Sequence, residues 1–189
     1  MLEIVAVIFG LLQGITIALN KKSNWIFYII QMILMCIFSY QNHLYGDTVN
    51  DFVYIFVGIY GWFSWSKPQS KITYCNTLQK ALVFAGLAIG YIVLRIKLAG
   101  TDDPLPSIDS FTTISSIAAT ALMMMRKVEA WILWFINDII YAVEYFALPN
   151  QAIYLMILNI LWVGLAIYSF INWKKIADAY EKDLHCSTI

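Results

Sequence analysis

The chain has 189 residues, of which 61% are hydrophobic and 13% are charged, and its formal net charge at pH 7 is zero. A soluble domain is nearer half apolar and a quarter charged, so this composition indicates an integral membrane protein. Equal numbers of basic and acidic residues give no sign of the excess positive charge that is typical of nucleic-acid-binding proteins. The three cysteines form no CxxC motif and no zinc-type spacing with histidine, so the sequence predicts no metal site, disulfide framework or cofactor.

Seven apolar runs are each long enough to cross a bilayer as a helix of roughly 17–23 residues. Most links between them are tight, so neighbouring spans are expected to be antiparallel. The predicted fold is therefore an all-α integral membrane protein with seven transmembrane helices. The runs cover residues 2–19, 24–40, 49–65, 81–98, 109–125, 131–148 and 151–173.

The basic residues predict how these spans are oriented. With seven spans, the links after the first, third and fifth runs and the C-terminal tail all lie on one side, and they hold most of the lysines and arginines. The positive-inside rule then predicts an external N-terminus and a cytoplasmic C-terminus. The residues on that side are Lys21, Lys22, Lys67, Lys71, Lys80, Arg126, Lys127, Lys174, Lys175 and Lys182.

The chain also contains a sparse internal repeat. Residues in the second and third runs match residues in the sixth and seventh at offsets of 106 and then 108 positions. A single helix between two three-helix units gives both units the same orientation in the membrane. Transporters with such repeats bind substrate at the interface between them. The matched pairs are Trp25 with Trp131, Gln31 with Asn137, Asp51 with Asn159, and Trp65 with Trp173. The predicted parts are a first repeat (1–65), a connector helix with its flanking links (66–108), a second repeat (109–175) and a cytoplasmic tail (176–189).

The stretch Glu129–Tyr141, EAWILWFINDIIY, is the strongest candidate for a binding site. At helical spacing Trp131, Trp134 and Asp138 lie on one stripe, with Asn137 at its edge and Tyr141 one turn further on. A carboxylate inside an apolar span is expensive unless it faces protein or a water-filled cavity. Two indoles beside it offer faces on which a ring or a cation can stack. The pattern predicts a small-molecule site inside the membrane.

Other polar and aromatic residues within the spans are further candidates for the cavity wall. Asp51 is followed at helical spacing by Tyr54, and its alternative role is a solvated acid at a helix end. Gln31 and Asn159 are amides within apolar runs, which either bind substrate or join helices. The remaining tryptophans near the expected cytoplasmic ends are typical of an interfacial belt. These are Trp25, Trp65 and Trp173.

The predicted cavity therefore combines acids, amides and aromatic rings, with no basic partner deep in any span. Such a cavity suits an organic cation or a polyhydroxylated aromatic compound, and it does not suit a phosphate. Two other functions remain open. An intramembrane enzyme would use Asp138 and Glu144 as a carboxylate pair, although no nucleophile or metal cluster joins them, and a sugar pore is the second alternative.

Four segments resemble the PnuC family of vitamin transporters, and the resemblance spans nearly the whole chain. It implies a three-plus-one-plus-three helix fold related in architecture to the SWEET sugar transporters. It also implies facilitated uptake of a dephosphorylated vitamin, most typically nicotinamide riboside, across a bacterial plasma membrane. A cytoplasmic kinase would trap the vitamin, and the assembly it suggests is a homotrimer. The segments are SNWIFYIIQMILMCIFSYQNHLYGD (Ser23–Asp47), IYGWFSW (Ile59–Trp65), RKVEAWILWFIND (Arg126–Asp138) and INWKK (Ile171–Lys175).

Two positions depart from the family pattern. Nicotinamide riboside transporters of this family carry glutamine at the position of Asp51 and asparagine at that of Asp138. An acid in place of an amide favours a cation. Nicotinamide riboside is a pyridinium cation and stays the leading substrate, thiamine is the runner-up, and neutral riboflavin is disfavoured.

Overall fold

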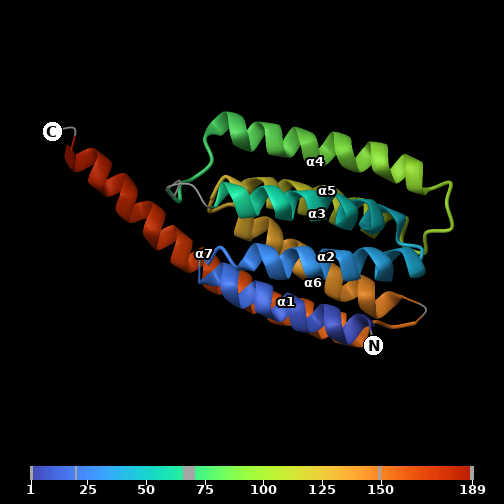
Figure 1. Ribbon diagram of the computed structural model, residues 1–189. Coiled ribbons are helices and arrows are strands. Elements are labelled where there is room, and N and C mark those ends of the chain that lie inside the picture. Colours follow the sequence, from blue (N-terminus) through green and yellow to red (C-terminus); the bar gives the residue numbers. More distant parts are fainter. Residues whose placement is uncertain (1, 20, 66–70, 149, 188–189) are drawn as a thin grey trace.

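The computed structural model describes residues 2–19, 21–65, 71–148 and 150–187, and this part of the chain forms seven α-helices (Figure 1). The all-α, seven-helix fold predicted from the sequence is confirmed. The helices are α1 (Leu2–Ala18), α2 (Asn24–Gln41), α3 (Tyr45–Ser64), α4 (Thr77–Leu98), α5 (Pro106–Met124), α6 (Ala130–Ala147) and α7 (Ile153–Ser187).

Four helices, α3, α4, α5 and α7, extend by three or more residues beyond the runs expected from hydropathy, and the extensions of α3 and α7 matter most here. α3 begins at Tyr45, four residues before the expected start, so that Gly46 and Asp47 belong to its first turn. α7 continues through the predicted tail to Ser187, because neither proline nor glycine interrupts the chain after Gly164. Figure 1 shows the C-terminal part of α7 projecting beyond the ends of the other helices.

Six of the helices form a closed ring around a central space. In the described part of the chain α1 packs on α2, α2 on α3, α3 on α5, α5 on α6, α6 on α7, and α7 returns to α1. α4 lies outside this ring, against α5 and the edge of α3 (Figure 1). Most side chains of α4 are exposed, and they include Phe84 and Ile96. α4 therefore connects the two halves of the chain without entering the ring.

Four helices of the described chain are long and apolar enough to cross a membrane on length and composition, namely α2, α4, α6 and α7. α1 is apolar but shorter. The polar helix α5 is packed between other helices, and its hydroxyls bond to its own backbone. Thr112 Oγ1 donates to the carbonyl of Ile108 at 3.0 Å, and Ser110 Oγ donates to that of Pro106 at 2.5 Å. A polar sequence can lie inside the bundle because few of its side-chain hydrogen bonds need water.

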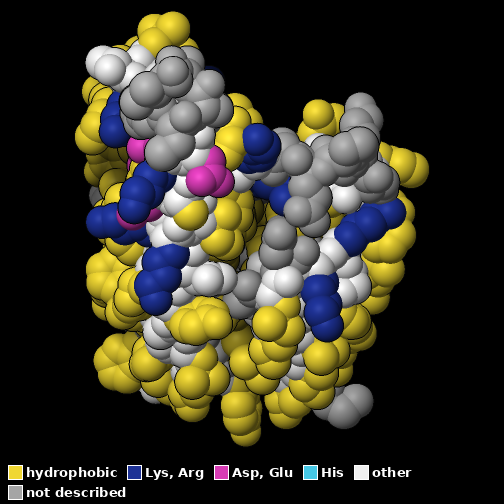
Figure 2. Space-filling view, turned by 90° about the vertical axis from the view of Figure 1, so that its left-hand side faces the viewer, with side chains coloured by type: hydrophobic (Ala, Val, Ile, Leu, Met, Phe, Trp, Pro, Cys, Tyr) yellow, Lys and Arg dark blue, Asp and Glu magenta, His cyan; other side chains and the backbone are white. Residues whose placement is uncertain are grey.

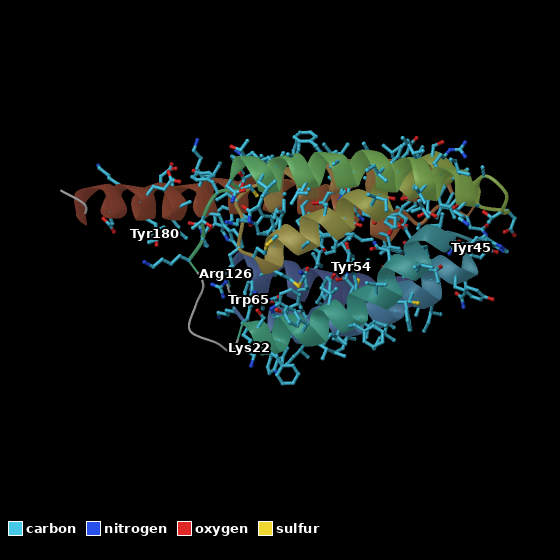
Figure 3. All side chains as sticks on the ribbon, turned by 90° about the horizontal axis from the view of Figure 1, so that it is seen from above. Lys22, Tyr45, Tyr54, Trp65, Arg126 and Tyr180 are labelled. Atoms are coloured by element: carbon cyan, nitrogen blue, oxygen red, sulfur yellow. The ribbon has the colours of Figure 1, made fainter. Side chains whose placement is uncertain are left out.

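One end of the bundle carries most of the basic side chains, as Figure 2 shows. Lys22 and Arg126 lie at this end and Tyr45 lies at the opposite end (Figure 3). The ammonium of Lys22 lies 3.7 Å from the ring centroid of Trp62, and the guanidinium of Arg126 lies 4.5 Å from that of Trp65. Both cations therefore stack on aromatic faces at the helix ends.

Trp25, Trp65 and Trp173 do not form an interfacial belt, and that prediction is wrong. They are 2%, 8% and 1% exposed. Trp25 meets Trp65 edge-to-face with 5.6 Å between ring centroids, and Trp173 meets Trp131 in the same way at 5.5 Å. The two pairs lie at matching positions of the repeat, 106 and 108 residues apart. Each pair packs the same end of one triplet, because the rings cover each other instead of facing lipid.

Gly61 of α3 makes the Trp25–Trp65 packing possible. A Cβ atom added to Gly61 would lie 2.5 Å from carbon atoms of the Trp25 ring. We expect Gly61→Ala to lower the apparent melting temperature of the purified protein, since overpacking typically costs about 1–3 kcal/mol. Gly164→Ala is the matched control, because nothing lies within 4 Å of the added atom. Equal melting temperatures for the two variants would contradict this account of the packing.

Candidate functional site

A cavity lies inside the ring and touches all six of its helices. Residues from α1 (Gln13), α2 (Tyr28), α3 (Asp51), α6 (Asp138) and α7 (Asn159) are part of its wall. α5 also contributes to the wall. The space open to the centres of water molecules is about 120 Å³. One water needs roughly 10–15 Å³ on this measure, so the cavity has room for several waters or for one small organic molecule.

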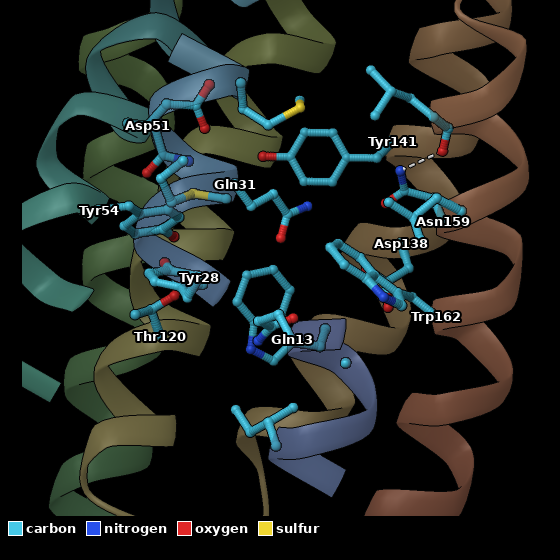
Figure 4. A pocket seen from close by; sticks show the side chains of 18 of the residues that line it. Gln13, Tyr28, Gln31, Asp51, Tyr54, Thr120, Asp138, Tyr141, Asn159 and Trp162 are labelled. Carbon is cyan, nitrogen blue, oxygen red and sulfur yellow. Dashed lines mark hydrogen bonds between the residues drawn. The ribbon is translucent and has the colours of Figure 1, made fainter. Parts of the chain in front are cut away.

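Eight of the nine residues predicted for the site line this cavity, and the fold thereby brings together residues from four helices. Figure 4 shows side chains of α2 and α3 facing those of α6 and α7 across the space. The eight residues are Gln31, Asp51, Tyr54, Trp131, Trp134, Asp138, Tyr141 and Asn159.

Asn137 is the exception, because its side chain is turned away from the cavity and toward α5. It is fully buried, and its Oδ1 accepts a hydrogen bond from Ser115 Oγ. An amide between two helices of this kind joins them. Asn137 therefore lies next to the binding stripe in sequence but packs α6 against α5.

The two acids predicted for the site differ in their hydrogen bonding. Asp51 Oδ2 accepts a hydrogen bond from Ser39 Oγ at 2.9 Å. Asp138 is 3% exposed, and its Oδ1 has no hydrogen-bond partner among the described residues. A buried carboxylate without a partner is costly. Asp138 is thus the acid whose partner has to come from whatever fills the cavity.

Aromatic side chains make much of the remaining wall. Trp131 is fixed edge-to-face on Trp173, while Trp134 is only partly buried and stands beside it on α6. The indole nitrogens of Trp131 and Trp162 have no hydrogen-bond partner among the described residues. These indoles offer both a stacking face and a free N–H donor to a bound molecule.

Several wall residues were not among the predicted ones. Asp47 was missed because the third span was expected to begin two residues after it. Tyr28 and Trp162 could have been found from the internal repeat, since they match Trp134 and Tyr54 at offsets of 106 and 108 residues. The missed polar and aromatic wall residues are Gln13, Trp25, Tyr28, Asp47, Asn50, Thr120, Tyr145 and Trp162.

The two halves of the wall match in position but differ in chemistry. Asp51 and Asn159 line the cavity from α3 and α7, and so do Tyr54 and Trp162 one turn further on. Asn159 uses its amide to donate to the carbonyl of Leu155 at 2.9 Å, which leaves its Oδ1 as an acceptor (Figure 4). Equivalent positions of the two repeats therefore line the cavity, but the side chains at these positions differ.

The ionisable side chains of the described wall include three acids and no bases. The acids are Asp47, Asp51 and Asp138, and none of the described wall residues is Lys, Arg or His. Glu144 does not line the cavity, so it does not form with Asp138 the carboxylate pair that an intramembrane enzyme would need. This wall can hold a cation or a neutral polar ring, and it repels an anion.

Comparisons with known proteins show the family to which the chain belongs. A family model described as nicotinamide mononucleotide transporter matches residues 1–175. The nicotinamide riboside transporter PnuC of Neisseria mucosa is 29% identical, over 94% of this chain and 73% of the relative. PnuC of Escherichia coli K12 is 32% identical, over 84% of this chain and 78% of the relative.

A solved structure shares the fold. The crystal structure of the vitamin B3 transporter PnuC superposes with a TM-score of 0.80 at 27% identity, covering 94% of this chain and 82% of the other. The family is one of membrane transporters, which excludes the enzyme alternative. With its closed helix ring and its acidic, aromatic cavity, this multi-pass membrane protein belongs to the nicotinamide mononucleotide transporter family, together with the PnuC transporters.

Proposed function

We propose that this transporter carries nicotinamide riboside across the plasma membrane. The observation that supports this best is a buried cavity lined by tryptophans, tyrosines and three carboxylates. Nicotinamide riboside combines a flat pyridinium cation with a ribose bearing hydroxyls. Its ring matches the aromatic faces, its charge matches the acids, and its hydroxyls match the amides and carboxylates.

The phosphorylated form of the same vitamin fits this wall poorly. The family model is described by the mononucleotide, whereas the similar relatives are described as transporters of the riboside. A phosphate is bound in proteins by arginine, lysine or backbone N–H groups. The described wall offers acids and no basic side chain, which favours the riboside.

In this proposal the α6 stripe holds the substrate. Trp131 and Trp134 stack on the ring, and Asp138 balances its charge or accepts its hydroxyls. Tyr141 continues the same face. The opposite wall adds further polar contacts from Gln31, Asp51, Tyr54 and Asn159. Asn137 positions α6 through Ser115 and does not touch substrate.

Transport would be facilitated diffusion, with a cytoplasmic kinase that phosphorylates the vitamin. The acidic cavity supports this, because phosphorylation converts the substrate into an anion that the wall repels. The product therefore stays inside the cell without a coupled ion. The homotrimer implied by the family resemblance stays a prediction.

Thiamine is the second candidate, because two acids occupy positions where the family resemblance leads us to expect amides. Asp51 and Asp138 both line the cavity. Thiamine also carries a permanent charge on a flat ring, so a thiazolium would gain from the same carboxylates.

Calorimetric titration of the purified chain tests the proposed substrate. We expect nicotinamide riboside to bind at least tenfold more tightly than nicotinamide mononucleotide, a difference of about 1.4 kcal/mol, because the phosphate meets carboxylates. Equal affinity for the two compounds would contradict the proposed substrate.

Asp138→Asn separates the two vitamins in the same titration. This change preserves the shape of the side chain and restores the amide found in nicotinamide riboside transporters, so riboside affinity should be retained. If thiamine is the substrate, its affinity should fall more than about tenfold. Binding of neither vitamin by the unmodified chain would exclude both.

The stacking role of α6 has its own test. Trp134→Ala should weaken riboside binding by roughly 1–2 kcal/mol, the scale of a desolvated aromatic–cation contact. Trp62→Ala is the matched control, because Trp62 lies under Lys22 on α3 and does not line the cavity. Unchanged affinity after Trp134→Ala, or an equal loss after Trp62→Ala, would contradict stacking of the substrate's pyridinium ring on Trp134.

The proposed topology places the basic end of the bundle in the cytoplasm. A reporter fused to the C-terminus should be active as a cytoplasmic protein, and one inserted near Asp102 should be external, because positive-inside charge sets orientation. The reverse pattern, or both reporters on one side, would refute this orientation.

A further inference from the structure

Three carboxyl groups meet at the end of the bundle opposite Lys22 and Arg126. Asp47 and Asp109 belong to the first turns of α3 and α5, and Glu144 belongs to the last turn of α6. They are 3%, 0% and 0% exposed. One oxygen from each lies within 4.8 Å of the others, so three helices contribute acids to a single buried point.

These carboxyl groups have few donors. Asp109 Oδ2 accepts from the backbone N–H of Gly46 at 2.9 Å, and its Oδ1 accepts from Thr113 Oγ1 at 3.2 Å. The Tyr141 hydroxyl donates to Asp47 Oδ1 over a long 3.4 Å. Both carboxylate oxygens of Glu144 lack any hydrogen-bond partner within the described residues.

Within the described residues, no basic side chain forms an ion pair with the cluster. The two ion pairs formed by the described residues involve other acids, Asp102 and Glu129. A fourth acid, Asp103 in the α4–α5 link, is also buried, and its Oδ2 has no hydrogen-bond partner among the described residues. Buried acids are normally paired or coordinate a metal.

The spacing of the oxygens can be compared with the spacing of oxygens around a bound metal ion. Ca²⁺ binds oxygen at 2.3–2.6 Å, so two oxygens on one ion lie at most about 4.6–5.2 Å apart. Mg²⁺ binds at 2.0–2.1 Å, which limits the separation to about 4.2 Å. The oxygens of this cluster all lie within 4.8 Å of one another, a limit that oxygens bound to one Ca²⁺ can satisfy.

We propose that Asp47, Asp109 and Glu144 bind a hard metal cation of the size of Ca²⁺, which joins α3 to α5 and α6. Gly46 adapts the chain to this site, because a Cβ atom there would lie 2.6 Å from Asp109 Oδ1. Asp47 also lines the central cavity, so the cation closes the cavity wall at this end. The site is independent of which vitamin is carried.

Equilibrium dialysis of the chelator-treated, purified chain against radioactive CaCl₂ tests the site directly. We expect one Ca²⁺ per chain, with at least tenfold weaker binding in Glu144→Gln and in Asp109→Asn. Asp102→Asn is the matched control, because Asp102 is exposed in the α4–α5 link near the same end. This control should bind calcium like the unmodified chain.

Thermal unfolding gives a second readout. A ligand that binds only the folded state raises its melting temperature, so CaCl₂ should stabilise the unmodified chain and leave Glu144→Gln unaffected. NaCl compared with KCl tests for a sodium ion, whose radius is similar to that of Ca²⁺ and whose binding would support the same site. Absence of binding and of stabilisation by both ions, or equal calcium binding in Glu144→Gln, would overturn the proposal.

Discussion

The cost of burying polar groups away from water governs this structure. Many polar side chains of the described chain are almost fully buried, in a protein whose outer surface is largely apolar. In such surroundings each of them needs a partner inside the protein. The closed ring meets this need by turning the polar faces of α3 and α5 inward, and α4 covers the outer side of α5. The central cavity and the carboxyl cluster both follow from this arrangement.

The internal repeat explains how one architecture produces an asymmetric site. The edge-to-face tryptophan pairs Trp25–Trp65 and Trp131–Trp173 fix equivalent ends of the two triplets. In the cavity wall, equivalent positions of the two repeats hold different side chains, for example Asp51 in the first repeat and Asn159 in the second. A symmetric frame suits a bundle that alternates between two sides of a membrane. Asymmetric contacts suit a substrate with a charged ring at one end and a sugar at the other.

The electrostatics of the wall connect substrate choice with the direction of transport. A cavity with carboxylates and no described basic residue favours a cation and disfavours a phosphate. In the proposed function the same property selects the substrate outside and excludes its phosphorylated product inside. The kinase would then supply the free energy for accumulation, and the wall would keep the phosphorylated product from leaving.

The sequence by itself determined the membrane class, the seven helices and half of the polar and aromatic residues that line the cavity. Helical periodicity was enough to place Trp131, Trp134 and Asp138 on one face, because neighbours on a helix are fixed by local geometry. It could not say whether Asn137 at the edge of that stripe faces substrate or Ser115, because this depends on a contact with another helix. The burial of Trp25 and Trp173 likewise depends on partners about 40 residues away in the chain. Only the tertiary structure brings Asp47, Asp109 and Glu144 together, since nothing local links first turns of two helices to the last turn of a third.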